Sequence, residues 1–280
     1  MKLSLCIAAY NEEKNIRLPL SSVIDLVDEV VLVDGGSTDK KVAIAKSYGK
    51  KVRVIKTDNS AMFHKNKQRA IEEAKGEWIL QLDADEELSE ELKNEIIDIL
   101  KIQSSKFTLR FGGQNDNAKF KIEKNEIVGY YIPRKNFFLT RFLTKGGQYP
   151  DYTIRLYRNG YARFPCKDVH ENVAVNGKTG YLKNPILHYA DPDFSRYLMR
   201  WDRYTTLEAE KLKSKLSDKK QNNFLMFFKY FFWLPTKTFI SMYLRHKGFA
   251  DGFPGFVFCL FSSIRFWVIY VKFKVESQKL

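Results

Sequence analysis

Short apolar runs alternate with amphipathic stretches through the first hundred residues, and this alternation constrains the fold more than any other feature. The runs suited to strands are Leu3 to Ala9, Val30 to Val33, Val52 to Ile55 and Trp78 to Leu82, with helix-like stretches between them. Strands that alternate with helices are typical of βα units on a parallel sheet. The sequence therefore predicts an α/β fold.

Polar residues directly follow three of these strands. Residues 10 to 12 follow the first strand, residues 34 to 37 end the second, and residues 83 to 86 follow the fourth. In open α/β sheets, ligands bind beyond the carboxyl ends of the strands. We therefore expect the three strand ends to converge on one ligand site.

Two aspartates, Asp83 and Asp85, follow the apolar run from Trp78 to Leu82. The strand would deliver both carboxylates to its carboxyl end, and alternation makes them point the same way. Mg²⁺ and Mn²⁺ take one or two protein carboxylates and fill their other positions with water and diphosphate oxygens. The pair is thus a candidate metal site, and the alternative is an acidic loop that caps the next helix.

The turn after Asp34 contains Gly35 and Gly36 and runs into a helix-like stretch. Such a turn lets the backbone approach a ligand closely. The chain has neither the GxGxxG nor the GxxxxGK[ST] pattern, so dinucleotide and P-loop interpretations lose support. Asp34 is a candidate for contact with a base or ribose, unless the turn only starts a helix.

The chain is strongly basic, with 47 Lys and Arg against 33 Asp and Glu, a net charge of +14. This excess favours phosphate-bearing partners, whether nucleic acid, anionic lipid or a phosphorylated small molecule. Three dispersed cysteines indicate neither a disulfide framework nor a zinc cluster, which fits a reducing cytosol. The first apolar run is too short for a signal peptide.

The middle of the chain has a looser pattern. We expect residues 104–147 to form a loop or short hairpins, residues 149–189 to be strand-like, and residues 192–216 to form a helix.

Aromatic residues are concentrated in residues 221–280, which hold 18 of the 41 in the chain and a net charge of +6. A spanning helix needs roughly 20 predominantly apolar residues, but the longest uncharged run, Gly252 to Ile264, stops at Arg265. The composition favours helices that lie in a membrane interface. The alternative is a helical pair packed on the rest of the protein.

Three segments, Ala8 to Glu13, Val33 to Asp39 and Gly76 to Glu86, together resemble the family 2 glycosyltransferases. Further motifs resemble the lipopolysaccharide-core β-glucosyltransferase subgroup; they are Tyr149-Pro150-Asp151, Arg155-Leu156-Tyr157, Val169-His170-Glu171 and Leu187-His188.

The resemblance implies a GT-A fold, a Rossmann-like mixed sheet flanked by helices. It covers residues 1–190 as the catalytic domain, with nucleotide-sugar binding in 1–103 and the acceptor and base region in 104–190. Residues 191–280 would form a helical, aromatic-rich and basic extension that associates with a membrane.

Carried over to this sequence, the resemblance implies that Ala9, Tyr10 and Glu12 line a nucleoside pocket and that Asp34 faces the base. Asp83 would approach the ribose, and Asp85 would bind Mg²⁺ or Mn²⁺. Many family members have a second acidic residue where Gly35 stands, so the identity of the donor stays open.

Other candidates are weighed against structural roles. Lys67 or Gln68 could touch the diphosphate, or belong to a solvated helix face. His188 could complete the metal site or bond within the core. Arg155 and Arg158 could orient acceptor or phosphate, although strand arginines in a basic protein are more often solvated.

Inversion at the anomeric carbon requires a carboxylate that takes the proton of the acceptor hydroxyl as attack proceeds. Glu171 is the first candidate, Asp168 the second and Asp151 a distant third. The alternative is that these carboxylates only form surface ion pairs.

These expectations describe an inverting glycosyltransferase that uses a nucleotide-sugar donor, expected to be a UDP-sugar. Its acceptor would be a lipid-linked glycan or lipopolysaccharide core, with no nucleic-acid partner. It would be cytoplasmic and peripheral on an anionic surface, the inner face of the cell membrane. The alternatives are a nucleotidyltransferase that uses the same aspartates and a non-catalytic scaffold.

Overall fold

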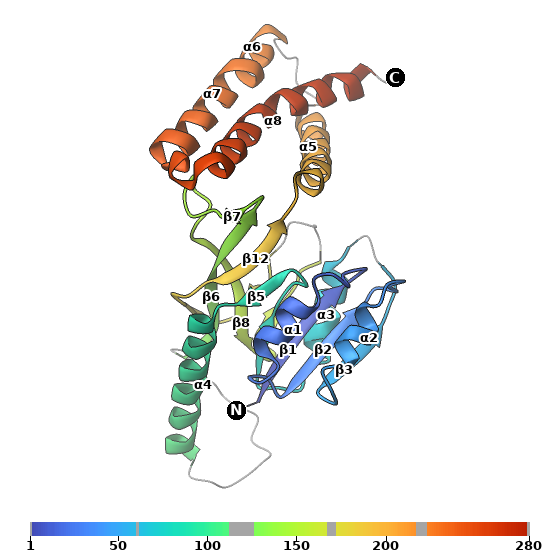
Figure 1. Cartoon of the computed structure of the whole chain (residues 1–280), viewed down its shortest axis with the longest axis vertical. Helices are drawn as coiled ribbons and strands as arrows, with labels where there is room; N and C mark the ends of the chain where they lie inside the picture. Colours follow the sequence, from blue (N-terminus) through green and yellow to red (C-terminus); the bar gives the residue numbers. More distant parts are fainter. Residues whose placement is uncertain (1, 60–61, 112–125, 167–171, 217–222, 279–280) are drawn as a thin grey trace. The chain divides into compact units, whose positions relative to one another are not determined.

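The computed structural model describes residues 2–59, 62–111, 126–166, 172–216 and 223–278. The chain divides into two compact units, which are described in turn (Figure 1). The first comprises Met1–Arg134 and Asp151–His188, and the second comprises Lys135–Pro150 and Tyr189–Leu280. Residues 135–150 therefore belong with the C-terminal helices.

Parallel strands begin the sheet of the first unit, in the spatial order β3-β2-β1-β4. Helices α1, α2 and α3 connect successive strands, which confirms the predicted βα units. The elements are β1 (Leu3–Ala9), α1 (Arg17–Val23), β2 (Glu29–Asp34), α2 (Lys41–Lys46), β3 (Val52–Lys56), α3 (His64–Glu72) and β4 (Trp78–Gln81).

Antiparallel strands extend the sheet beyond β4, so the sheet is mixed, as predicted. Strand β8 pairs with β4 and with β6, and β11 runs parallel to β6. Strand β5 pairs with β12 and β7 with β6, while β9 and β10 pair with each other in a separate two-stranded sheet. These strands are β5 (Glu86–Leu88), β6 (Ile127–Phe138), β7 (Arg141–Phe142), β8 (Asp151–Arg158), β9 (Ala162–Arg163), β10 (Ala174–Val175), β11 (Lys178–Tyr181) and β12 (Ile186–Asp191).

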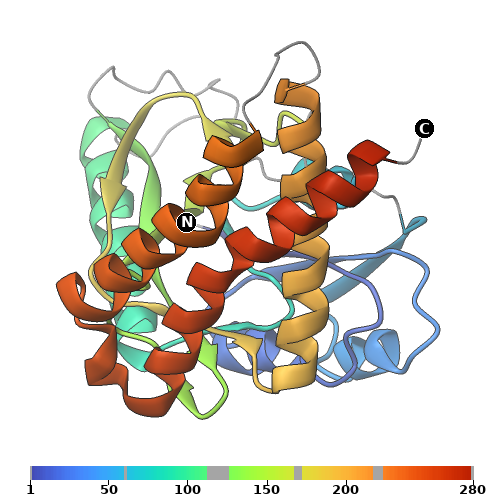
Figure 2. The same ribbon diagram turned by 90° about the horizontal axis from the view of Figure 1, so that it is seen from above.

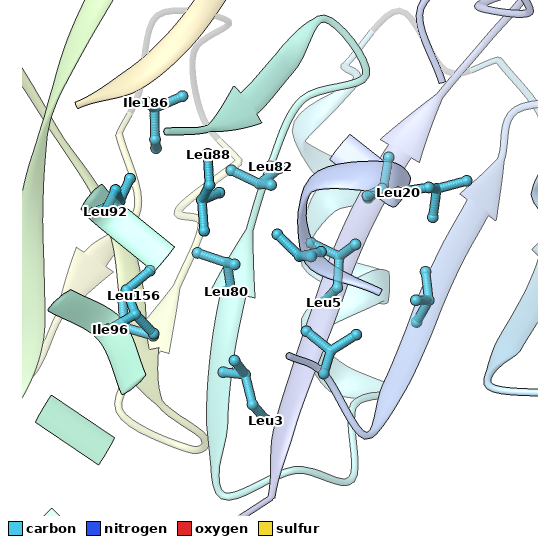
Figure 3. Packing of buried hydrophobic residues seen from close by; sticks show 14 of the residues in the cluster. Leu3, Leu5, Leu20, Leu80, Leu82, Leu88, Leu92, Ile96, Leu156 and Ile186 are labelled. Atoms are coloured by element: carbon cyan, nitrogen blue, oxygen red, sulfur yellow. The ribbon is translucent and has the colours of Figure 1, made fainter. Parts of the chain in front are cut away.

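Each face of the sheet has its own apolar cluster. Leu5 and Leu80 face α1, α2 and α4 (Glu90–Phe111), where they meet Leu20 and Leu92 (Figure 3). On the opposite face, strand residues meet α3; this second cluster includes Cys6, Ile79, Ala70, Ile71, Ile154 and Tyr157. Alternation along each buried strand supplies both faces.

A short hairpin of the expected kind is present where β6 pairs with β7, but other parts of residues 104–147 are more regular than expected. Helix α4 continues to Phe111, and β6 is a strand of 12 residues that contains Gly129 and Pro133. In a sequence, glycine and proline both argue against a continuous strand. In the structure, a Cβ at Gly129 would lie 3.2 Å from the Ile154 side chain, so close packing favours glycine there.

Helices make up most of the second unit. Helix α8 (Gly252–Gln278) packs against α5 (Phe194–Leu216) and against a continuous helical run (Figure 2). That run comprises α6 (Asn223–Phe228), η1 (Lys229–Trp233), α7 (Leu234–Phe239) and η2 (Ile240–Arg245), and the turn η3 (Gly248–Asp251) follows. Among the described residues, one helical stretch, Gly248–Val275, has the length and composition to cross a membrane.

A buried carboxylate joins the loop after β7 to the C-terminal helices. Asp251 is 1% exposed and accepts hydrogen bonds from the N–H groups of Thr144 and Lys145 at 2.9 and 2.7 Å. The Thr144 hydroxyl adds a third at 3.0 Å. These bonds satisfy a charge that would be costly to bury alone, and they explain why residues 135–150 belong to the second unit.

A buried ion pair fixes the end of β2. Lys41 is fully buried, and its Nζ lies 2.6 Å from the Ala9 carbonyl and 2.7 Å from Asp34 Oδ1. Burial alone would raise the pKa of the Asp34 carboxyl, but hydrogen bonds from Lys41 and Ser37 outweigh it and hold that pKa below its usual value. This pair ties α2 to the ends of β1 and β2.

Asp34→Asn should lower the free energy of unfolding at neutral pH by about 3–5 kcal/mol, because Lys41 would lose its counter-charge in the interior. The depressed pKa of Asp34 means that its contribution is present above the unfolded value of about 3.9 and is lost as pH falls through the folded value. Urea unfolding at several pH values should therefore show the gap between wild type and variant closing below about pH 4.

The exposed Asp25 provides a control, since Asp25→Asn should change stability by under about 0.5 kcal/mol at every pH. A gap for Asp34→Asn that stayed constant into acid would contradict the role of this ion pair.

Candidate functional site

The carboxyl ends of β2, β1 and β4 lie side by side, because these strands are neighbours in the sheet. Ala9 and Asp34 are register partners at the ends of β1 and β2. The loops that follow are bonded to each other: the Asn11 N–H donates to Ser37 Oγ at 2.9 Å, and the Thr38 N–H donates to Asn11 Oδ1 at 2.9 Å. The predicted strand ends thus meet at one edge.

The residues expected to line a nucleoside pocket occupy these loops. Tyr10 is 42% exposed, and Glu12 accepts a hydrogen bond from Asn15 at 2.7 Å. Asp34 is 2% exposed, with one carboxylate oxygen engaged by Lys41 and the Ser37 N–H. Its position beside Ala9 is therefore fixed before any ligand arrives.

Two cations flank Asp83 after the end of β4. Lys67 on α3 lies 2.5 Å from one carboxylate oxygen, and Arg155 on β8 lies 2.6 Å from the other. Burial alone would raise the pKa of the Asp83 carboxyl, but the charges of Arg155 and Lys67 outweigh it and hold that pKa well below its usual value. Asp83 is therefore ionised at neutral pH.

Arg155 occupies a bulge in β8. The register between β6 and β8 runs Tyr130 to Leu156 and then Tyr131 to Ile154, so Arg155 is the extra residue. Bulges re-aim side chains next to functional sites. The Arg155 guanidinium reaches Glu86 at 2.8 Å as well as Asp83.

Glu86 completes this arrangement from a fully buried position. Its second oxygen accepts the Asp83 N–H at 2.9 Å, and Arg134 lies 3.5 Å from its first. Arg134 in turn pairs with Asp151 at 2.7 Å. For Arg155, burial would lower the pKa of the guanidinium, but Asp83 and Glu86 outweigh that effect and raise the pKa. The turn between β4 and β5 is thus anchored by buried charges.

The structure differs from the expected strand geometry at the two aspartates. Strand β4 ends at Gln81, and Glu86 N–H donates to the Asp83 carbonyl at 3.2 Å, which closes a turn. The carboxylates consequently have different partners. Asp85 Oδ1 lies 3.6 Å from Nε2 of His188 on β12, so the two predicted metal ligands are adjacent. The described residues contain no group of three or more His, Cys, Asp or Glu arranged for a metal ion.

Lys67 and Gln68 have separate environments on α3. The Gln68 amide donates to Glu72 at 2.8 Å and accepts the Phe164 N–H at 2.8 Å. Both ends of its side chain are thus engaged within the protein, whereas Lys67 faces Asp83.

The catalytic candidates Asp168 and Glu171 lie outside the described residues, and Asp151 is paired with Arg134.

Sequence reasoning missed the roles of Lys41 and Glu86, and the alternative that Arg155 and Arg158 are solvated was wrong. Arg155 and Arg158 are each 5% exposed, and Arg158 pairs with Glu77 at 2.9 Å. For Arg155 the available signal was its place between the apolar Ile154 and Leu156, since charged side chains are almost never fully buried unless paired.

The model for the family described as "Glycosyl transferase family 2" matches residues 4–163. An uncharacterized glycosyltransferase of Rickettsia bellii is 30% identical over 95% of this chain and 84% of its own length. A lipopolysaccharide core biosynthesis glycosyltransferase of Rhizobium meliloti is 24% identical over 94% of this chain and 88% of that protein.

A mannosyltransferase from Pyrobaculum calidifontis, solved in complex with GDP-Man and Mn²⁺, has a similar fold. The comparison of the two structures gives a TM-score of 0.53 and a sequence identity of 11%. It covers 99% of this chain and 88% of the mannosyltransferase chain. The likeness agrees with the GT-A fold that the motifs imply. With its family model matched over more than half its length and a 30% identical relative along nearly all of it, the chain belongs to the family 2 glycosyltransferases.

Proposed function

We propose that this glycosyltransferase moves a sugar from a nucleotide-sugar donor to a membrane-associated glycan, by a metal-assisted single displacement with inversion. The observation that carries the proposal is the turn after β4, where Asp83 and the Asp85–His188 pair lie beside the ends of β1 and β2. Family membership favours glycosyl transfer over the nucleotidyltransferase and scaffold alternatives.

On the donor side, Ala9, Tyr10, Glu12 and Asp34 would bind the nucleoside, and Asp83 would meet the ribose. Lys67 is the better candidate for the diphosphate, because the Gln68 amide is already engaged at both ends. A UDP-sugar remains the expected donor.

Asp85 and His188 would hold Mg²⁺ or Mn²⁺. A carboxylate and an imidazole supply two ligands, and a Mg²⁺-type site leaves its other positions to water and phosphate oxygens, so the residues fit such an ion. Bound there, the cation would neutralise the charge that develops on the leaving nucleoside diphosphate.

Asp85→Asn should reduce turnover by a factor on the order of 100 or more, because the metal would lose its anionic ligand. It should also abolish the Mn²⁺ dependence of UDP binding, measured by titration calorimetry. Asp25→Asn is the matched control on an exposed carboxylate. Near-normal turnover of Asp85→Asn with Mn²⁺ present would show that Asp85 does not hold the metal.

On the acceptor side, we keep Glu171 as the base and Asp168 as the alternative. Glu171→Gln should preserve donor affinity and cut transfer, because a lost proton acceptor matters chiefly in the transition state. Asp168→Asn, assayed in parallel, should retain most activity. The opposite result, with Asp168→Asn inactive and Glu171→Gln active, would exchange the two roles.

Membrane attachment is supported by the exposed surface of the second unit. Fourteen of the 22 exposed large apolar side chains among the described residues lie within residues 223–275. In the helical run from α6 to η2, the exposed phenylalanines Phe224, Phe228 and Phe232 follow one another at four-residue spacing and are here called the aromatic row. The exposed Ile240 and Leu244 continue this spacing further along the run.

On a regular α-helix, side chains four residues apart are offset by about 40° around the helix axis, so a row with this spacing would wind around the helix. Segments η1 and η2 are π-helical, with more residues per turn, and this partly cancels that winding. The aromatic row can then stay on one side, and the same helical run carries the exposed cations Lys229, Lys237 and Arg245. Basic residues near an anionic surface contribute about 1 kcal/mol each, and apolar rings add burial.

Full-length protein should therefore pellet with phosphatidylglycerol vesicles, less so in high salt, and weakly with phosphatidylcholine vesicles. Replacing Phe224, Phe228 and Phe232 together by Ser should lower partitioning more than tenfold, since each ring contributes burial. The matched control replaces the exposed Met199 and Tyr204 of α5 by Ser, which keeps the net charge, and its partitioning should stay close to that of wild type.

Equal pelleting of the phenylalanine variant and wild type would contradict docking through the aromatic row. Protease protection of a tail segment on the far side of the vesicle would establish spanning in place of peripheral attachment.

A further inference from the structure

Three tyrosines from three strands of the first unit form one cluster, here called the tyrosine platform. They are Tyr131 on β6, Tyr152 on β8 and Tyr181 on β11. The Tyr181 ring stacks on Tyr131 with centroids 5.1 Å apart and meets Tyr152 edge to face at 5.0 Å. Tyr181 is 64% exposed and Tyr152 is 43% exposed.

The platform lies on the sheet face that carries the second apolar cluster. Tyr131 is the register partner of both Tyr181 and Ile154, and Ile154 belongs to that cluster. Tyr152 is two residues from Ile154 along β8, so alternation places it on the same face. This is the face on which α3 lies, with Lys67 bonded to Asp83.

The platform and the nucleoside residues lie on opposite sides of β4 along the sheet. The strand order is β2-β1-β4-β8-β6, with β11 next to β6. Strand β8 runs antiparallel to β4, so the start of β8, where Tyr152 stands, extends past the carboxyl end of β4. The Asp83 turn therefore separates the β1 and β2 loops from the tyrosines.

Cross-strand packing alone does not account for this cluster. Aromatic pairs across strands stabilise a sheet by about 0.2–1 kcal/mol, and we would expect rings with only this role to be covered by neighbouring side chains. Here the central residue, Tyr181, is 64% exposed and is not sealed by neighbours. Tyrosine is enriched at binding interfaces, because its ring is apolar and its hydroxyl is polar.

We infer that the tyrosine platform binds a pyranose ring of the acceptor saccharide. The C–H face of a pyranose carries partial positive charge and suits the negative face of an aromatic ring, while the tyrosine hydroxyls can bond sugar hydroxyls. The inference rests on the proposed function, because it assigns the acceptor to the side of β4 away from the nucleoside residues.

The test uses full-length protein and a panel of methyl glucoside, methyl galactoside and methyl mannoside, with binding followed by saturation-transfer NMR. Wild type should bind at least one glycoside. Tyr181→Ala should weaken that binding about tenfold, whereas Tyr181→Phe should stay within about twofold, since the ring is kept. Tyr204→Ala, on an exposed tyrosine of α5, should change nothing.

UDP binding by the same variants separates this inference from the proposed function. Unchanged UDP affinity in Tyr181→Ala supports an acceptor subsite, and weakened UDP affinity would assign the ring to the donor and overturn the inference. Equal glycoside binding by Tyr181→Ala and wild type, or no glycoside binding by wild type, would also overturn it. Wild type could bind a glycoside but no nucleotide. If Tyr181→Ala then lost that glycoside binding, the inference about the tyrosine platform would stand and the proposed nucleotide-sugar donor would be wrong.

Discussion

The site depends on one buried cation, Arg155, held between Asp83 and Glu86. An unpaired charge in a protein interior costs several kcal/mol, so the guanidinium must keep both carboxylates close. Glu86 also accepts the Asp83 N–H, which fixes the backbone of the turn that carries Asp85. The orientation of the proposed metal ligand therefore follows from the bulge that places Arg155 inside the sheet.

These contacts continue into a chain of alternating charges. Each cation in it contacts at least one carboxylate, and the six side chains sum to zero; they are Lys67, Asp83, Arg155, Glu86, Arg134 and Asp151. A nucleoside diphosphate would bring negative charge to a place where each cation, including Lys67, already has a carboxylate partner, so Lys67 alone would not offset that charge. A divalent ion at Asp85 and His188 would supply the missing positive charge, which is a physical reason to expect metal dependence.

Local pattern was enough to predict the βα units, because strand and helix periods are encoded within a few residues. The buried charges were not predictable in the same way, since Arg155 and Asp83 are 72 residues apart in sequence. Because the chain has a net charge of +14, the sequence also favours the interpretation that any single arginine is solvent-exposed. The prediction that Asp83 and Asp85 point the same way was wrong because strand β4 ends at Gln81 and a turn follows. The contacts that form a turn are not described by strand alternation.

Helix α8 meets the length requirement for a membrane span, but its ion pairs argue for a surface arrangement. Lys272 donates to Asp202 at 2.6 Å and to the hydroxyls of Thr205 and Thr206, and Arg265 lies 3.8 Å from Glu208. All of these partners are on α5. Spanning would either break the pairs, at about 2.5–3.5 kcal/mol for each charge left in hydrocarbon, or carry the charged face of α5 into the bilayer. A helix that lies on the membrane keeps every pair intact.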